Sequence, residues 1–355
     1  MLNSLYEKAI TKKDFVYNIE PTADIDSQLN GKWFDRNINK SQLDFSIAAG
    51  DGSFNKKKFL KANFCAVDAE SVIYDGEIKK IEDGDIFDIP HVSFLDELLS
   101  NYMSIYELKC ALNAIKNHNV DYYLFDGSIL GDLDNAYPRG AKLPSQIRDN
   151  LNNDLLNEFE KRLDFTEFGF VFPQIRDSRW GNHIKKDDPK IIEEFNLQLA
   201  SIEKIILLKE ILQYRKKIIS ISKSSSDNGL FQWNIPDIAV LDRFTEKQGL
   251  SLIKNDFKVF DKAAFPFFND FFKGLNFTIF YVRLEDYKNI FKVELPYKAS
   301  NEEVFRIIEK LRVFSAQGYP YLLNMAHNDV VIKDKNINEL LKIAKIYETT
   351  NREML

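Results

Sequence analysis

Two short acidic segments are the residues of this chain most able to do chemistry. Each is an Asp-Gly-Ser sequence directly after an apolar run: Asp51 follows FSIAAG, and Asp126 follows YYLF. Alternate residues of a strand share a face, so Phe45, Ile47 and Ala49 would lie on the face of Asp51. Burying an ionised carboxylate in such a row costs several kcal/mol unless a cation or hydrogen bonds compensate. Two strands that each end in an Asp-Gly-Ser turn can bring their carboxylates together at one edge of a sheet. The sequence therefore predicts a shared divalent-metal site there.

A third acid, Glu107, lies in a helical pattern between these two segments. Residues 89–119 carry apolar residues at helical spacing, with Ser93 as the expected N-cap. The residues three and four positions from Glu107 are small or apolar, such as Met103 and Cys110, which indicates a packed face. A partly exposed glutamate whose carboxylate reaches water is the alternative interpretation. If the acid-bearing strands are parallel neighbours, a right-handed crossover lays this helix near both strand ends.

Three carboxylates without a thiolate form a hard oxygen ligand set, which favours Mg²⁺ or Mn²⁺ over zinc or copper. One or two such ions activate water and stabilise the leaving oxygen in phosphodiester cleavage. His327 and Tyr319, near the C-terminus, are candidates for a general acid or base or for a contact with the scissile phosphate, and His327 also for a metal ligand. Lys223 lies where the apolar strand 216–225 ends. A structural histidine and an exposed lysine are the alternative interpretations of His327 and Lys223.

Two groups of basic residues lie close in sequence to the proposed site. They are Lys56, Lys57, Lys58 and Lys61, and Arg215, Lys216 and Lys217. Such groups are candidates for contacts with a nucleic-acid backbone, which weaken as salt rises. Taken singly, such a group is more often a solvated surface.

The composition is that of an ordinary soluble globular protein. Of 355 residues, 45% are hydrophobic and 29% are charged, and the net charge is -6. This balance argues against a uniformly basic nucleic-acid binder but permits local basic patches and metal-neutralised acids. Two cysteines, Cys65 and Cys110, are too few for a disulfide framework and indicate a reducing compartment. Without a signal-peptide pattern or a membrane-spanning apolar run, we expect a cytoplasmic protein.

The remaining patterns predict one α/β domain, residues 44–355, with an N-terminal extension, residues 1–43. A helical insertion or layer is expected at about residues 140–210. The expected strands and turns are a hairpin turn at Asp75 and Gly76, a strand at 168–175, and a hairpin formed by 276–284 and 289–296. The expected helices are 190–215, a helix with Asn301 as N-cap, the following helix that carries His327, and 334–349.

The chain resembles the NurA family of archaeal and bacterial DNA nucleases. The segments that carry the resemblance are AAGDGS, LFDGSIL, IISISKSS, FYVRL with VELP, and GYPYLLNMAHNDVVI. They occur in the family's order from about residue 45 to 335, and the last is the most specific. The resemblance implies a ribonuclease-H-like core, which is a mixed sheet flanked by helices. It also implies a manganese-dependent nuclease, with Mg²⁺ as a possible substitute.

The resemblance also implies roles for individual residues. By position, Asp51 and Asp126 match the two metal-binding aspartates of the family and Glu107 matches its helix glutamate. Tyr319 and His327 match its C-terminal pair, and Lys223 matches a strand lysine that contacts phosphate. Because IYELKCAL around Glu107 is the least distinctive segment, Glu70 and Glu97 stay as alternatives to Glu107.

Family members degrade single- and double-stranded DNA from 5′ to 3′ and nick single strands. They act as homodimers docked on the hexameric HerA translocase, with other break-processing machinery, during resection of broken ends. The resemblance implies the same activities and partners here.

Two other functions fit the sequence. One is a non-catalytic DNA or translocase adaptor on the same scaffold, which would have no use for a complete set of acids. The other is a different phosphoryl-transfer enzyme, such as an aspartyl-phosphate phosphatase, in which Asp132 would follow the nucleophile Asp126. The repeated Asp-Gly-Ser segment and the late histidine favour the nuclease.

Overall fold

A ten-stranded mixed sheet forms the centre of the computed structural model, which describes residues 3–17, 25–136, 153–178, 189–259 and 265–346. Its strands are β1 (Trp33–Asp35), β2 (Ile47–Lys58), β3 (Ala62–Tyr74), β4 (Ile78–Pro90), β5 (Tyr122–Asp126), β6 (Ile218–Ser222), β7 (Gly249–Ser251), β8 (Lys254–Phe257), β9 (Phe277–Arg283) and β10 (Phe291–Leu295). The strand order is β1-β7-β9-β10-β6-β5-β2-β3-β4, and β8 pairs with β9 beside this path. The predicted α/β class, a mixed sheet flanked by helices, is confirmed.

The two acid-bearing strands are parallel neighbours within this sheet. β2 pairs with β5, with Gly50 opposite Phe125, and β5 continues in parallel to β6. On the other side, β2, β3 and β4 form a long antiparallel meander. The predicted turn at Gly76 joins β3 to β4, and its φ of +108° suits glycine. The predicted hairpin of β9 and β10 is also present.

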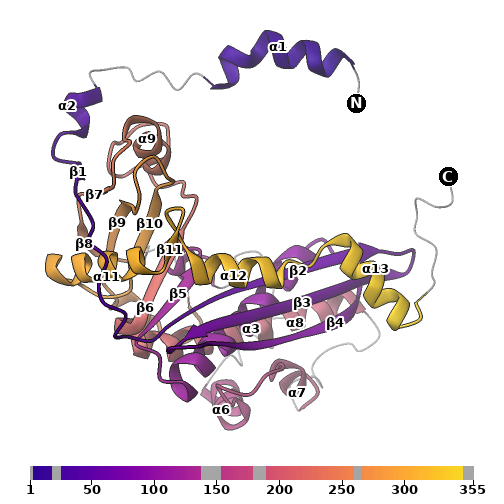
Figure 1. The fold of residues 1–355 in the computed structure, drawn as a ribbon. Coiled ribbons are helices and arrows are strands. Elements are labelled where there is room, and N and C mark those ends of the chain that lie inside the picture. Colours follow the sequence, from indigo (N-terminus) through magenta and orange to yellow (C-terminus); the bar gives the residue numbers. More distant parts are fainter. Residues whose placement is uncertain (1–2, 18–24, 137–152, 179–188, 260–264, 347–355) are drawn as a thin grey trace.

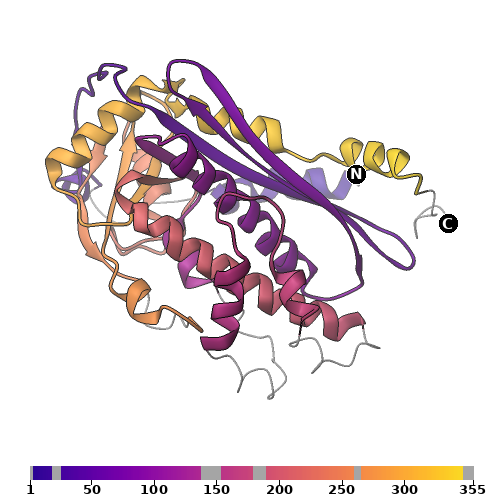
Figure 2. The same cartoon turned by 90° about the horizontal axis from the view of Figure 1, so that it is seen from below.

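Helices cover both faces of the sheet. The helices of the described residues are α1 (Asn3–Tyr17), α2 (Ile25–Leu29), α3 (Leu95–Asn117), α4 (Ile129–Asp134), α6 (Asn153–Arg162), α7 (Phe172–Arg176), α8 (Pro189–Ile211), α9 (Asp237–Phe244), α10 (Asn269–Lys273), α11 (Asn301–Val313), α12 (Tyr321–Val330) and α13 (Asp334–Ile343). Figures 1 and 2 show α3 and α8 on one face and α11 and α12 on the other, each pair with its own hydrophobic cluster. In Figure 1, α1 stands away from the body, whereas β1 pairs with β7 at the sheet edge. No helix among the described residues is long and apolar enough to cross a membrane.

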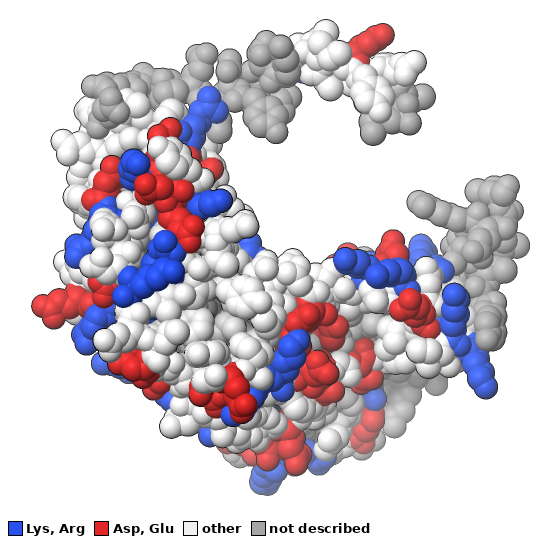
Figure 3. Space-filling model, viewed as in Figure 1, with Lys and Arg blue, Asp and Glu red and all other residues white. Residues whose placement is uncertain are grey.

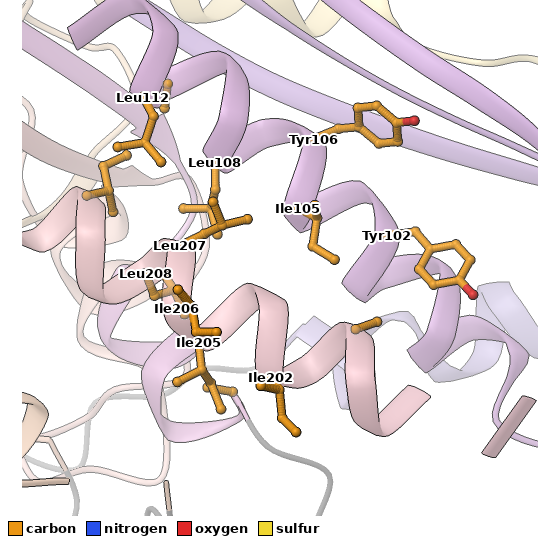
Figure 4. Packing of buried hydrophobic residues seen from close by; sticks show 14 of the residues in the cluster. Tyr102, Ile105, Tyr106, Leu108, Leu112, Ile202, Ile205, Ile206, Leu207 and Leu208 are labelled. Atoms are coloured by element: carbon orange, nitrogen blue, oxygen red, sulfur yellow. The ribbon is translucent and has the colours of Figure 1, made fainter. Parts of the chain in front are cut away.

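The helix pair α3 and α8 forms the largest part of the core. Figure 4 shows Leu108 of α3 beside Leu207 of α8, within a cluster of buried aliphatic and aromatic side chains. An ion pair is buried between the same helices: Lys109 Nζ lies 3.4 Å from Glu203 Oε1, and both side chains are almost fully buried. Burying two charges is tolerable only when hydrogen bonds satisfy them, and here they do.

The prediction of a strand at residues 168–175 is wrong. The backbone N–H groups of Val171 and Phe172 donate to the buried carboxylate of Glu203 instead of to a neighbouring strand. α7 then begins at Phe172, with Pro173 in its first turn, where the missing N–H of proline costs nothing. The aromatic residues that suggested a strand pack against Tyr102 of α3.

Two predicted N-caps are each displaced by one residue. The N-cap of α11 is Ser300, not Asn301, because Ser300 and Glu303 form a reciprocal capping box. The cap of α3 is Phe94, not Ser93. α13 ends at Ile343, inside the predicted range, and residues 347–349 of that range lie outside the described residues. Parts of the expected insertion, 140–152 and 179–188, also lie outside them.

Candidate metal centre and active site

The first Asp-Gly-Ser segment is not a turn, contrary to the prediction. β2 runs through it from Ile47 to Lys58 and pairs throughout with β3, with Asp51 opposite Glu70. The glycine has a different purpose: a Cβ on Gly52 would lie 2.8 Å from Cγ and Oε1 of Glu107. The bare strand at Gly52 therefore lets α3 bring Glu107 against β2.

The second Asp-Gly-Ser segment is a turn, as predicted. β5 ends at Asp126, and Gly127 has a φ of +114°. Ser128 Oγ donates to Glu294 Oε1 at 2.7 Å, and the N–H of Leu130 donates to Glu294 Oε2 at 3.1 Å. Glu294 is fully buried on β10 and pairs with Lys292 at 3.1 Å. A buried ion pair thus fixes the turn that carries Asp126.

Sequence reasoning missed Glu294. Its signal is the alternation of Lys292 and Glu294 on one face of an otherwise apolar strand, FKVEL. Two opposite charges at that spacing on a buried strand indicate a satisfied ion pair that holds something in place.

Asp51, Asp126 and His327 converge where β5 ends beside the middle of β2. Each offers one ligand atom, and these atoms all lie within 4.8 Å of one another. His327 Nδ1 lies 2.7 Å from Asp51 Oδ2. The side chains of Asp51 and Asp126 are 14% and 15% exposed, and that of His327 is 48% exposed. Two mostly buried carboxylates therefore open to solvent beside a half-exposed imidazole.

The first acidic strand also positions the helix of His327. Ser53 Oγ, two residues after Asp51, accepts from the N–H of Ile332 at 3.1 Å. Asn55 donates to the carbonyl of Ile332 at 2.9 Å. These bonds attach the segment just after α12 to β2. The strand that carries Asp51 therefore also holds the helix that carries His327 in place.

Lys223 and Tyr319 both contact Asp126. Lys223 Nζ donates to Asp126 Oδ2 at 2.8 Å, and the hydroxyl of Tyr319 lies 3.4 Å from the same oxygen. The Lys223 ammonium lies 4.7 Å from the centre of the Tyr319 ring. Burial, followed by the charge of Asp126, raises the pKa of Tyr319, so the phenol stays protonated and acts as a donor.

Glu107 lies beside the three converging residues but outside their group. It and Asp126 line the same cavity of about 30 Å³, which has room for one or two waters. Burial, followed by the charges of Asp132 and Asp51, raises the pKa of Glu107 to about 8, while Lys204 lowers it. The packed-face interpretation of Glu107 fits this position.

The two alternatives to Glu107 have other surroundings. Glu70 is buried on β3, and its Oε2 lies 3.3 Å from Lys80 Nζ. Glu97 lies in the first turn of α3 and lines a different cavity. Glu70 lies opposite Asp51 in the β2–β3 pairing, but of the three glutamates Glu107 is the one that shares a cavity with Asp126.

The donor set fits a divalent cation. Two carboxylates and an imidazole that converge, with a third carboxylate adjacent, carry more negative charge than Lys223 alone balances. Carboxylate oxygens with one imidazole nitrogen suit Mn²⁺ and also accept Mg²⁺.

Several of the basic residues noted in the sequence have structural partners. Lys56 pairs with Asp96, and Lys57 donates to Asn338 at 2.8 Å. Lys217 donates to the carbonyl of Val120 at 2.8 Å. On the face drawn in Figure 3, Lys and Arg are interspersed with Asp and Glu instead of forming one basic surface.

The chain is similar to known nucleases. A protein from Methanocaldococcus jannaschii, described as a probable DNA double-strand break repair nuclease NurA, is 29% identical over 97% of this chain and 90% of its own length. The DNA double-strand break repair nuclease NurA of Saccharolobus solfataricus is 27% identical, with 97% of this chain and 95% of the relative covered. The protein is therefore a nuclease.

Structural comparison agrees with the sequence relatives. The crystal structure of the NurA nuclease from Sulfolobus solfataricus matches with a TM-score of 0.73 and 25% identity over 97% of each chain. A NurA crystal structure with dAMP and manganese has the same fold, with a TM-score of 0.68 and 17% identity over the whole of each chain. The NurA domain matches residues 45–332, and the chain belongs to the NurA family.

Gly52→Ala is expected to lower kcat/KM for DNA cleavage about 10- to 100-fold. The new methyl would overlap Glu107 and Met103, and relieving such overpacking costs about 1–3 kcal/mol. Steady-state kinetics and thermal unfolding measure the two effects. Because Glu107→Asp shortens the side chain by one methylene, the double variant should be less impaired than the product of the two single effects. Purely additive losses would contradict the contact.

Proposed function

We propose that this protein is a Mn²⁺-dependent DNA nuclease that resects broken DNA ends. It degrades single- and double-stranded DNA from 5′ to 3′ and cuts single strands internally. The observation that carries the proposal is the convergence of the ligand atoms of Asp51, Asp126 and His327 to within 4.8 Å of one another. The names of the curated relatives and the NurA structure with dAMP and manganese support it.

The proposed roles follow from the contacts. Asp51, Asp126 and His327 would hold the cation, with Glu107 beside them. A bound divalent ion supplies positive charge for the phosphate oxygens and lowers the pKa of water. The Lys223 ammonium is 44% exposed and available to a phosphate, while Tyr319 donates from beside Asp126. Because Nδ1 of His327 faces Asp51, Nε2 would either ligate the cation or exchange a proton with a substrate oxygen.

The two other functions have less support. Asp132, which a phosphatase would need beside Asp126, lies outside the converging group and next to Lys204 at 4.0 Å. A non-catalytic adaptor gives no reason for two nearly buried carboxylates to open together toward solvent.

The wider assignment rests on family membership. We propose a ribonuclease-H-like core, supported by an antiparallel meander continued by the parallel strands β5 and β6. The nuclease domain would span residues 44–355, with an extension at 1–43 and an insertion at about 140–210. The protein would act in the cytoplasm as a homodimer on a hexameric HerA-type translocase, with other break-processing machinery.

Removal of the cation tests the proposal. Linear DNA labelled at either the 5′ or the 3′ end is incubated with protein and Mn²⁺, Mg²⁺ or EDTA. We expect early release of the 5′ label with Mn²⁺, slower release with Mg²⁺, and at least a roughly 10³-fold loss in EDTA that added Mn²⁺ reverses. Cleavage that is equally fast in EDTA would contradict a metal nuclease, and early loss of the 3′ label would contradict the polarity.

A further inference from the structure

Lys204 is a buried lysine without a close anionic partner. It lies on α8 and is 5% exposed. Of the described residues only Asp132 pairs with it, at 4.0 Å, which is too long for a hydrogen bond. The side chain of Asp132 is itself 55% exposed, so much of its charge faces water. An ammonium taken out of water costs several kcal/mol unless it is compensated, which indicates a further anionic ligand.

Two cavities meet at Lys204. The small cavity of about 30 Å³ is lined by Glu107 and Asp126 of the candidate metal centre. A second cavity of about 410 Å³ is open to solvent, and this size falls in the range of ligand sites. Ser128, Asp132 and Lys204 line both cavities. Lys204 therefore lies at the junction between the metal centre and an open cleft.

The open cleft has the chemistry of a nucleotide site. Beside Lys204, its lining includes the amides of Asn101 and Asn135, the hydroxyls of Ser100 and Ser128, and the carboxylates of Glu97 and Asp132. Amides and hydroxyls serve base edges and sugar oxygens, and an ammonium serves a phosphate. Asn101 is fixed by a hydrogen bond from its amide to Ser201 of α8 at 3.0 Å, so this wall is preformed.

We propose that Lys204 and the open cleft bind the nucleotide next to the cleaved one, with the Lys204 ammonium on its phosphate. The inference rests on the proposed nuclease function, because a strand that crosses the metal centre would continue into this cleft. It assigns a substrate-binding role to α8, on the sheet face opposite α12. Lys204 is thus a positioning residue for the DNA strand.

Oligonucleotide binding at several salt concentrations tests the proposal. A fluorescent single-stranded DNA oligonucleotide is titrated into full-length wild type, Lys204→Met and Lys204→Arg, with Ca²⁺ in place of Mn²⁺ to prevent cleavage. Lys209→Met, on the same helix, is the matched control. We expect Lys204→Met to weaken binding about tenfold and to reduce the slope of log K against log salt by about 0.7, the value for one lost phosphate contact on a single strand. Lys204→Arg should keep most of the slope, and Lys209→Met should behave as wild type.

The outcomes separate this proposal from the proposed function. An unchanged salt slope in Lys204→Met would overturn the proposal that Lys204 binds a phosphate. This holds also where the activity and the melting temperature of the variant both fall, because an unchanged slope with lower stability assigns Lys204 a structural role. Cleavage by wild type together with an unchanged slope would leave the nuclease function standing without this site. If Lys204→Met has a reduced salt slope but the wild-type protein fails to cut DNA, the result would support the site and refute the nuclease function.

Discussion

Asp51→Asn is expected to lower cleavage of linear DNA in Mn²⁺ at least about 10³-fold while the protein stays folded. Asparagine has the same shape and keeps the oxygen that accepts the N–H of Gly52 at 2.9 Å. It removes one of the two carboxylates that converge with His327. A metal ion contributes several kcal/mol to such a reaction, and about 4 kcal/mol corresponds to a factor of about 10³.

Stability separates this effect from misfolding. In metal-free wild type, the converging carboxylates of Asp51 and Asp126 repel each other. Removing one negative charge should therefore leave the melting temperature of the metal-free protein unchanged or higher, and should reduce its increase on addition of Mn²⁺. Asp88→Asn, which changes an exposed acid on β4, is the control and should behave as wild type. Activity of Asp51→Asn within tenfold of wild type would refute the assignment.

The sequence was informative where a charged residue continues the apolar face of a short predicted strand. The alternation through Phe45, Ile47 and Ala49 placed Asp51 on an apolar face, and that row does pack in the cluster under α12. The same logic located Asp126, because Tyr122 and Leu124 lie in the same cluster. The parallel pairing of the two strands stood only as a condition in the sequence-based expectation, and the structure meets that condition.

Other features depend on distant contacts that local patterns do not encode. An Asp-Gly pair is a common turn signal, but twelve residues of pairing with β3 hold residues 51–53 extended. The aromatic run at 168–175 has strand propensity, but Glu203 of α8 takes its N–H groups. Glu294 contacts the turn after β5, and Lys204 of α8 lines the cavity of Glu107 and Asp126; because these elements are far apart in sequence, local patterns do not reveal either neighbour.

Glu294→Ala is expected to lower the free energy of unfolding by about 3–5 kcal/mol. Glu294 is fully buried, and its removal leaves the almost buried Lys292 with only Asp227, at 3.7 Å. It also leaves the N–H of Leu130 and the hydroxyl of Ser128 without their acceptor. Urea unfolding measures the loss.

A double variant separates the charge effect from the effect on the turn. Replacing a buried ion pair by apolar residues of similar volume is often neutral, so Lys292→Met with Glu294→Leu should recover most of the lost stability. The turn at Gly127 would still lack its support from β10, because neither new side chain accepts a hydrogen bond. We therefore expect the double variant to be nearly as stable as wild type but about tenfold less active, from a displacement of Asp126 that costs about 1.4 kcal/mol. Full recovery of both stability and activity would show that Glu294 serves only the core, and a loss below 1 kcal/mol in Glu294→Ala would contradict the buried ion pair itself.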